Sequence, residues 1–425
     1  MTRSTPPRVL FIHNGSPGRF TPLARALLAR GWTGALINGP AGAAIAGLET
    51  RRYQAGKPEQ RSSYRPARGV EDAFLAGRGA AQEAERLRAE GFVPDLIIGH
   101  PGWGEMLFLA EVFPGVPQIQ LGEFYYRSDG ADANFDPEFP ARRLDSRITV
   151  ATQNTALALS HVHAAAIVAP TLFQASLIPD CFEDRLHVIH EGIATERIGP
   201  MATGSGGTPA RDPVILADGT VLDGGAPWIS FASRRFEPLR GVHVFMRMLP
   251  QLFALVPDLR VVMVGADDAD IYGLAPPGGG TWLATMLAEL GDRLDRSRLH
   301  VVPPVPPGVL HRIMAGAVAH VYLTYPFVLS WSLLEAMACE ALVIASDTAP
   351  VRDAVAHGEN GLLVDFFDQA ALAAQIAAVC ADPGRFAPLR RAARQSVVDG
   401  FDRTRLCEPA WLRLIGEVSG IALPE

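Results

Sequence analysis

The sequence predicts an α/β protein with two Rossmann-like, doubly wound domains that face a central cleft. Short apolar runs rich in Val, Ile and Leu alternate with helical patterns along the chain, which is typical of parallel sheets covered by helices. The length of 425 residues exceeds what one hydrophobic core usually organises. Because ligands bind beyond the carboxyl ends of the strands in such sheets, we expect the active site to lie in the cleft between the two domains.

A stretch rich in Gly, Pro, Thr and Asp divides the chain near its middle. We therefore expect a first domain over 1–198, a linker or surface excursion over 199–227, a second domain over 228–400, and a helix over 401–425 that packs back on the first domain. Strands are expected at Val9–Ile12, Ala35–Asn38, Asp95–Gly99, Gln118–Leu121, Ala165–Ala169, His187–Ile189, Trp228–Phe231, Arg260–Val264, Leu299–Val302, Ala319–Leu323, Ala341–Ala345 and Gly361–Val364. Helices of the second domain are expected at Val242–Leu255, Gly308–Ala315 and Ser330–Cys339.

Composition excludes several classes of protein. A net charge of −7 argues against a nucleic-acid binder, which would carry a basic excess. The sequence has neither a long uncharged apolar run nor an apolar signal segment after Met1, so we expect a cytoplasmic protein. Lys57 is the only lysine and lies in a polar loop, which excludes a phosphate-binding P-loop and a pyridoxal phosphate enzyme.

The segment Arg51–Arg68 is the one strongly basic stretch. It holds six cations against a single acid, Glu59. Such a segment can contact an acidic acceptor or the anionic inner face of a membrane. A plain solvated loop explains the same composition, and both interpretations stay open.

Two loops between a strand and a helix are candidates for phosphate binding. Gly15 and Ser16 lie in a tight turn after the first strand, where backbone N–H groups can approach a phosphate, although a turn without a ligand is equally compatible. Arg235 and Arg240 lie between the first strand and the first helix of the second domain. Two guanidinium groups there can converge on a pyrophosphate, and the alternative is a solvated helix cap.

Glu335 lies within an otherwise apolar helix, LSWSLLEAMA. A buried carboxylate without partners is costly, so ligand hydroxyls are candidate partners. The alternative is a structural bond to the neighbouring backbone.

The order of these elements resembles the family-four retaining glycosyltransferases of the GT-B fold over nearly the whole chain. The resemblance implies a metal-independent enzyme that uses nucleotide sugars. In that family a Gly-Arg pair, followed five positions later by Lys-Gly, holds the donor pyrophosphate. Here Arg235 and Arg240-Gly241 match, with arginine in place of lysine. Of the family's two glutamates separated by seven residues, Glu335 matches the second, which contacts the ribose, and Phe327 replaces the first.

Phe327 cannot accept a hydrogen bond from a sugar hydroxyl, so recognition of the donor must use other groups. We expect the unpaired backbone N–H groups of Val328, Leu329 and Ser330, just before the next helix, to take over. Phe327 itself should pack against the sugar ring or the domain core. A further departure from the family is Glu340, which stands where glycine is usual.

The acceptor side is predicted from the segment DLIIGHPGWGEMLFLAEVFPGVPQIQLGEFYY, which resembles a bacterial subgroup often linked to exopolysaccharide synthesis. His100 ends a strand in this segment, and the family often places a histidine near the reacting centre. We place His100, Glu105 and Glu123 on the acceptor side, and we predict that His100 is also a catalytic residue. A structural histidine remains the alternative.

No metal and no cofactor are expected. The acidic segment 265–270 follows a strand in the wrong architecture for a metal-binding acidic motif. His161, His163, His187 and His190 lack a complete ligand set and are interpreted as structural.

The predicted function is transfer of a hexose-like group from a nucleotide diphosphate sugar to a carbohydrate or lipid-linked acceptor, with retention. Arg235 and Arg240 would act catalytically, because they stabilise the charge that develops on the leaving diphosphate. Two alternatives stay open: a nucleotide-sugar epimerase or phosphorylase on the same fold, and a non-catalytic nucleotide-sugar-binding protein.

Overall fold

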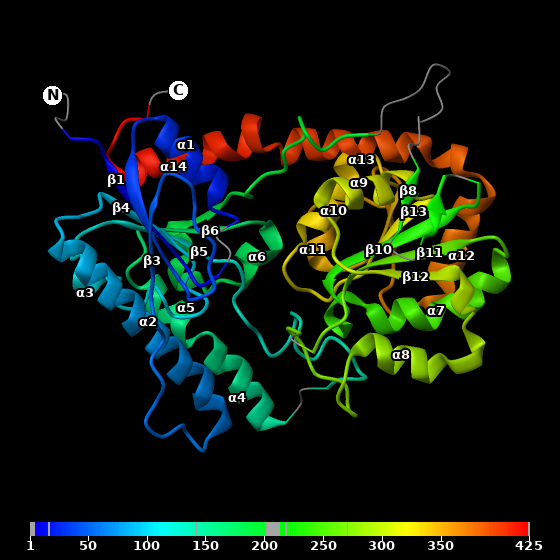
Figure 1. The fold of residues 1–425 in the computed structure, drawn as a ribbon, viewed down its shortest axis with the longest axis horizontal. Coiled ribbons are helices and arrows are strands. Elements are labelled where there is room, and N and C mark those ends of the chain that lie inside the picture. The colour runs from blue at the N-terminus through cyan, green and yellow to red at the C-terminus, as the bar shows by residue number, and fades with distance from the viewer. Residues whose placement is uncertain are drawn as a thin grey trace. The chain divides into compact units, whose positions relative to one another are not determined.

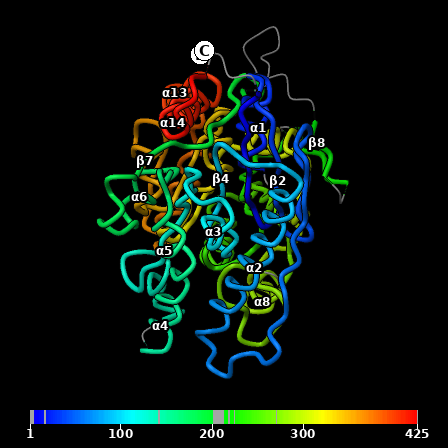
Figure 2. Tube along the Cα trace, turned by 90° about the vertical axis from the view of Figure 1, so that its left-hand side faces the viewer, coloured from blue at the N-terminus to red at the C-terminus, as the bar shows by residue number. Residues whose placement is uncertain are grey.

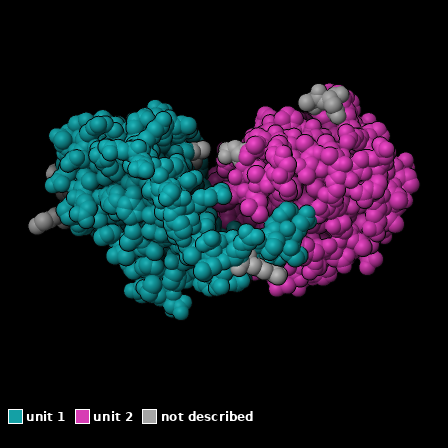
Figure 3. All heavy atoms as spheres, turned by 90° about the horizontal axis from the view of Figure 1, so that it is seen from below, with its two compact units in different colours: residues 1–192, 404–425 teal, residues 193–403 magenta. Residues whose placement is uncertain are grey.

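The structure is a computed structural model that describes residues 5–15, 18–140, 143–200, 213–216, 219–223, 225–269 and 271–423. The chain divides into two compact units, which Figure 3 shows in different colours. The first unit comprises 1–192 and 404–425, and the second comprises 193–403. Each unit is built on one parallel sheet, as the sequence predicts.

The first unit holds a seven-stranded parallel sheet in the order β3-β2-β1-β4-β5-β6-β7 (Figure 1). Its strands are β1 (Arg8–His13), β2 (Thr33–Asn38), β3 (Glu49–Arg52), β4 (Leu96–Gly99), β5 (Gln118–Leu121), β6 (Ala166–Ala169) and β7 (Leu186–Val188). Its helices are α1 (Thr21–Ala29), α2 (Arg65–Ala89), α3 (Leu109–Val112), α4 (Leu144–Gln153), α5 (Thr155–His161), α6 (Leu172–Leu177) and α14 (Glu408–Ser419). Helix α4 packs beside α2 (Figures 1 and 2).

Alternation along β1 separates two hydrophobic layers in the first unit. Phe11 faces one layer and Ile12 faces the other, because successive side chains of a strand point to opposite faces. The layer under Phe11 contains α1 and the C-terminal helix α14, which buries Trp411 and Ile415. The layer under Ile12 contains α2, through small residues such as Ala80. The last helix of the chain therefore completes the core of the first unit.

The second unit holds a six-stranded parallel sheet in the order β12-β11-β10-β13-β14-β15. Its strands are β10 (Trp228–Arg235), β11 (Arg260–Ala266), β12 (Leu299–Val302), β13 (Ala319–Tyr322), β14 (Val343–Ser346) and β15 (Leu362–Val364). Its helices are α7 (Val242–Leu255), α8 (Trp282–Leu290), α9 (Pro307–Gly316), α10 (Trp331–Ala338), α11 (Ala349–Arg352), α12 (Gln369–Ala381) and α13 (Ala387–Gly400).

Eleven of the twelve predicted strands are found within two residues of their expected ends, and the twelfth, predicted as Trp228–Phe231, extends to Arg235. Within the two parallel sheets, the strand that sequence reasoning missed is β3, whose residues are Glu49, Thr50, Arg51 and Arg52. It forms an edge of the sheet, where charged residues are common because they discourage pairing with another chain. Its sequence therefore lacks the apolar pattern that reveals the other strands.

The boundary between the units differs from the predicted one. Ile193 already belongs to the second unit, because it is buried in that unit's core and its N–H donates to Phe401 O at 2.7 Å. The predicted excursion 199–227 is also only partly a surface segment. It contains the antiparallel pair β8 (Val214–Ile215) and β9 (Val221–Leu222), whose Val214 and Leu222 are buried against the second sheet. Residues 201–212, 217–218 and 224 lie outside the described part.

Candidate functional site

Three strands of the first unit end in a His-x-Gly triplet. The triplets are His13–Gly15 at the end of β1, His100–Gly102 after β4 and His190–Gly192 after β7. In each, the histidine Nδ1 accepts a hydrogen bond from the glycine N–H, at 3.0, 3.0 and 2.9 Å. An Nδ1 atom that accepts carries no proton, so the neutral ring carries its proton on Nε2.

His100 is fixed by a hydrogen bond at each ring nitrogen and by a stacking contact. Its Nε2 lies 2.9 Å from Glu123 Oε2, and its ring stacks on Trp103 with centroids 4.5 Å apart. Both ring nitrogens therefore have partners within the protein, and only 4% of the residue is exposed. His100 and Glu123, both predicted for the acceptor side, are brought together by the fold. That they contact an acceptor stays a prediction.

Arg19 joins two partly buried carboxylates that are far apart in the sequence. Its guanidinium forms ion pairs with Glu123 and, at 2.5 Å, with Glu191. Burial would raise the pKa of Glu123, but Arg19 and the bond from His100 lower it to about 2. Burial acts on Glu191 in the same way, and Arg19 again outweighs it, so the pKa of Glu191 lies below its usual range. Both groups are ionised at neutral pH.

Sequence reasoning missed Arg19, His13, His190 and Glu191. The signal that could have found three of them is the repeated His-x-Gly triplet after parallel strands, because carboxyl ends of strands meet at one edge of the sheet. His190, interpreted as structural from the sequence, lies beside this cluster, with its Nε2 3.7 Å from Glu191 Oε2. Arg19 carries no such signal.

Two predicted residues of the first unit have less access to a ligand than expected. Glu105 is 0% exposed, and it accepts a hydrogen bond from Tyr53 Oη at 2.6 Å. Burial raises the pKa of Glu105 above its usual value. The N–H of Gly15, expected to be available to a phosphate, is engaged by His13. Ser16, its predicted partner in phosphate binding, lies outside the described residues.

The second unit places both predicted arginines at the carboxyl end of β10, where Arg235 is the last residue of the strand and Arg240 follows five residues later. Arg235 donates from Nε to Asp268 Oδ1 at 2.8 Å, so one carboxylate of the acidic segment 265–270 serves an arginine. Asp270 lies outside the described residues. Arg240 ends a short 3₁₀ turn, Pro238–Arg240. The next residue, Gly241, has φ 72°, and a Cβ there would lie 2.4 Å from Leu323, so the turn requires glycine.

Arg240 is anchored by neutral oxygens alone. Its Nη1 donates to Tyr322 Oη at 3.2 Å, Thr324 Oγ1 at 2.8 Å and Val328 O at 3.1 Å. Among the described residues, no carboxylate forms an ion pair with Arg240, whereas Arg235 has one. The half-buried Arg240 guanidinium is thus a positioned cation that pairs with none of the described carboxylates. Such a group is suited to a diphosphate.

Phe327 packs within the second unit. It is 6% exposed, and its ring lies 5.4 Å from Tyr272 and 5.6 Å from the Arg240 guanidinium carbon. The expectation that the backbone before α10 is unpaired is wrong for Ser330, whose N–H donates to Tyr322 Oη at 3.0 Å. The tyrosine hydroxyl accepts both from this amide and from Arg240, which ties the turn before α10 to the arginine.

Val328 and Leu329 are buried at 9% and 3% exposure, and the Val328 carbonyl holds Arg240. Their predicted contact with the donor stays a prediction. Glu335, on α10, is 21% exposed in its side chain, and its Oε2 lies 3.4 Å from His311 Nε2. The carboxylate is therefore partly exposed although the sequence around it is apolar, and its contact with a ligand stays a prediction.

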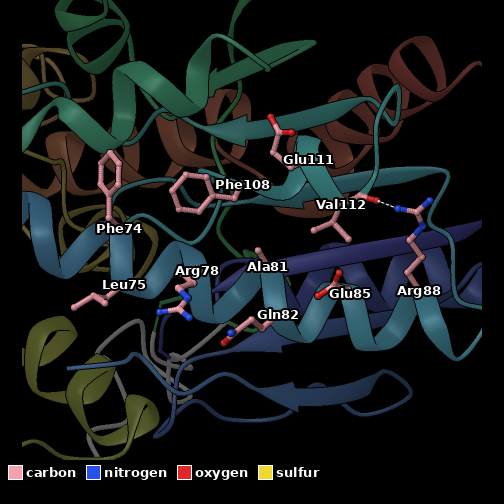
Figure 4. Close-up of a pocket in the computed structure, with 10 residues that line it drawn as sticks. All are labelled: Phe74, Leu75, Arg78, Ala81, Gln82, Glu85, Arg88, Phe108, Glu111 and Val112. Atoms are coloured by element: carbon pink, nitrogen blue, oxygen red, sulfur yellow. Dashed lines mark hydrogen bonds between the residues drawn. The ribbon is translucent and has the colours of Figure 1, made fainter. Parts of the chain in front are cut away.

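One groove lies elsewhere in the first unit, between α2 and α3 (Figure 4). It has a volume of about 590 Å³, and its wall combines the apolar Phe74, Phe108 and Val112 with charged side chains. Arg88 crosses it to donate to Val112 O at 2.9 Å. The groove contains none of the predicted site residues. Among the described residues, no helix has the length and apolar character needed to span a bilayer.

Comparison with protein families assigns both halves of the chain. Residues 31–198 match the family described as "Glycosyl transferase family 4 group", and residues 223–396 match "Glycosyl transferases group 1". The predicted glycosyltransferase class is thereby confirmed at the level of the family.

Curated relatives carry the same class name. The D-inositol 3-phosphate glycosyltransferase of Thermobispora bispora is 30% identical over 256 residues, which are 57% of this chain and 54% of the relative. That of Kribbella flavida is 28% identical over 322 residues, 74% of this chain and 69% of the relative. The chain spans about half the length of the first curated relatives it matches.

Solved structures share the fold. Sucrose-phosphate synthase from Thermosynechococcus elongatus superimposes with a TM-score of 0.71 at 18% identity, over 98% of this chain and 100% of that one. The Anabaena HepE protein in complex with UDP-glucose gives 0.64 at 16% identity, over 96% and 99%. The chain therefore shares the GT-B fold of these structures, and it carries a domain that matches the glycosyltransferase family 4 group in its first half and a domain that matches glycosyltransferases group 1 in its second half.

Proposed function

We propose that the chain transfers a sugar from a nucleotide diphosphate sugar to a hydroxyl of a carbohydrate or lipid-linked acceptor, with retention of the anomeric configuration. The observation that carries the proposal is Arg240. A cation placed at the carboxyl end of a parallel sheet and balanced by no carboxylate among the described residues fits an anionic ligand. The matching family domains supply the class of reaction.

The chemistry follows from how charge moves during transfer. As the glycosidic bond breaks, the nucleotide diphosphate gains negative charge, and a fixed cation stabilises that state more than the intact donor. Arg240 is held rigidly by three oxygens, so it need not reorganise as the charge develops. Arg235, shared with Asp268, would contribute less. Glu335 would accept from the ribose hydroxyls.

The donor to test first is UDP-glucose, because one structural neighbour is titled as a complex with that molecule. The acceptor to test first is D-inositol 3-phosphate, after the printed names of the relatives. Unphosphorylated myo-inositol and glucose complete the panel. On the acceptor side we place His100 and Glu123, with Glu105 behind them.

Product analysis distinguishes the competing functions. Transfer predicts a glycoside together with free UDP, and retention predicts an α-linked product from UDP-glucose. An isomerised sugar would indicate an epimerase, and a sugar phosphate formed from a glycoside and inorganic phosphate would indicate a phosphorylase. Binding of UDP-glucose with neither transfer nor slow hydrolysis would indicate a non-catalytic protein and would overturn the proposal.

We also propose peripheral contact with an anionic membrane surface through the basic segment Arg51–Arg68. Arg51 and Arg61 form ion pairs with acids of the same unit, so their charges are partly balanced. Lys57 and Arg65 are exposed, and neither forms an ion pair with a described residue. Arg52 and Arg68 also form no ion pair with a described residue, but they donate to the carbonyls of Gly42 and Ser62, so Lys57 and Arg65 are the least engaged cations of the segment.

Cosedimentation with vesicles of phosphatidylglycerol tests the membrane contact. The double variant Lys57→Ala and Arg65→Ala should bind less than the wild type, whereas Arg61→Ala should bind nearly as well. No binding by the wild type, or binding unaffected by the double change, would remove the proposal.

A further inference from the structure

His13 differs from His100 in one respect that matters for ligand binding. Its Nδ1 accepts from Gly15 N–H at 3.0 Å, which places the proton of the neutral ring on Nε2. In the described part of the chain, that Nε2–H forms no hydrogen bond, whereas the Nε2 of His100 is bonded to Glu123. Of these two rings, His13 is the one with a donor to offer.

The surroundings of His13 keep its ring neutral and fixed. The rings of Phe20, His100 and Trp103 lie 5.8, 5.9 and 5.7 Å from it. Burial lowers the pKa of His13 to about 4, with His100 and Arg19 adding to the effect and Glu123 opposing it. His13 is therefore uncharged at neutral pH.

Trp103 gives this donor an adjacent binding surface. It is 36% exposed, although one face of its ring stacks on His100. An exposed aromatic ring can pack against the apolar face of a sugar or cyclic polyol, and a polar group beside it then fixes the orientation. His13 and Trp103 together provide both parts of such a site.

We propose that the Nε2–H of His13 donates a hydrogen bond to an oxygen of the acceptor substrate, which packs against Trp103. This inference rests on the proposed transferase function. His13 acts as a donor and not as a general base, because the nitrogen that faces the ligand already carries the proton. His100 supports the site as a positioning residue, held by Glu123 and stacked under Trp103.

Substitution by amide side chains distinguishes the roles of the two ring nitrogens of His13. In His13→Gln the amide nitrogen reaches the place of Nε2 and can still donate. In His13→Asn the amide lies near the place of Nδ1, where it can accept from Gly15 N–H but cannot reach the acceptor. His13→Ala removes both interactions. Thermal melting of each variant, with and without UDP, checks that the fold and the donor site persist.

The test measures transfer from radiolabelled UDP-glucose at varied concentrations of D-inositol 3-phosphate, myo-inositol and glucose. With the acceptor that the wild type uses, kcat/KM for the acceptor should fall about tenfold in His13→Asn and His13→Ala and stay within about threefold in His13→Gln. The Kd for UDP should not change in any variant.

Each outcome separates the inference from the proposed function. If the wild type transfers glucose and His13→Asn matches it, or if His13→Gln falls as far as His13→Ala, the donor role of His13 is wrong while the transferase stands. If the wild type modifies none of the acceptors, the proposed function fails and the inference fails with it.

Discussion

The carboxyl ends of the two sheets handle charge in opposite ways. In the first unit, Arg19 pairs with both Glu123 and Glu191, so one cation there faces two carboxylates. In the second unit, Arg240 is held by neutral oxygens. A shared architecture can therefore carry an excess of carboxylates at the edge of one sheet and, at the edge of the other, a cation that pairs with no described carboxylate. We expect four measurable consequences of this difference between the two units.

The buried His13 should make the stability of the first unit sensitive to acid. The pKa of His13 falls from 6.5 to about 4 on folding, so between these values the unfolded chain binds a proton that the folded chain does not. Stability is therefore unaffected above pH 6.5 and is lost as the pH falls towards 4, by about 3 kcal/mol at most.

Urea unfolding followed by circular dichroism checks this expectation. His13→Gln, which cannot take up the proton, should flatten the fall in unfolding free energy over that range of pH. His163→Gln, at an exposed histidine of the same unit, serves as the control and should not. Identical profiles for the wild type and His13→Gln would show that His13 is not buried as described.

The second unit should lose donor affinity when its unbalanced cation is removed. Arg240→Ala should weaken UDP binding by about 2 kcal/mol, or roughly thirtyfold, because one charge-assisted contact is lost. Arg235→Ala should cost less, since Asp268 already shares its charge. Arg247→Ala, which breaks a surface pair with Glu289, is the matched control and should leave the Kd unchanged. Calorimetry that ranks Arg235 above Arg240 would reverse the assignment.

A carboxylate introduced beside Arg240 should abolish the contrast between the two units. Phe327→Glu places an acid where the phenyl ring now lies 5.6 Å from the guanidinium carbon, and the new ion pair would compete with the diphosphate. We expect UDP affinity to fall about tenfold, and Phe327→Leu to be milder. Faster transfer by Phe327→Glu with UDP-glucose would show instead that the family's glutamate role is latent in this pocket.

The smallest expected effect concerns the turn after α10, which carries Glu335. Glu340 has φ 57°, a left-handed conformation that favours glycine. Glu340→Gly should raise the free energy of unfolding by about 1 kcal/mol. Glu340→Gln keeps the strained backbone conformation and should leave the free energy of unfolding unchanged. A Glu340→Gly variant no more stable than Glu340→Gln would mean that the glutamate makes a compensating contact.

Sequence reasoning succeeded where local pattern determines structure. The buried strands are short apolar runs, so their positions could be predicted. The place of Arg235 and Arg240 at the carboxyl end of a strand could be predicted for the same reason. Sequence reasoning failed where distant residues meet. The contact between Arg19 and Glu191 spans 172 positions, and the pairing of Arg235 with Asp268 spans 33. The sequence also could not show that the Ser330 N–H donates a hydrogen bond, because its acceptor is the side chain of Tyr322 on the preceding strand β13.

Proton NMR of UDP-glucose turnover, with EDTA present, tests the central claim most directly. The acceptor is the one that the wild type uses. We expect the wild type to convert the donor into UDP and an α-linked glucoside without added metal, and Arg240→Ala to do so at least about tenfold more slowly. Unchanged turnover in Arg240→Ala, or turnover that requires magnesium or manganese, would contradict this expectation.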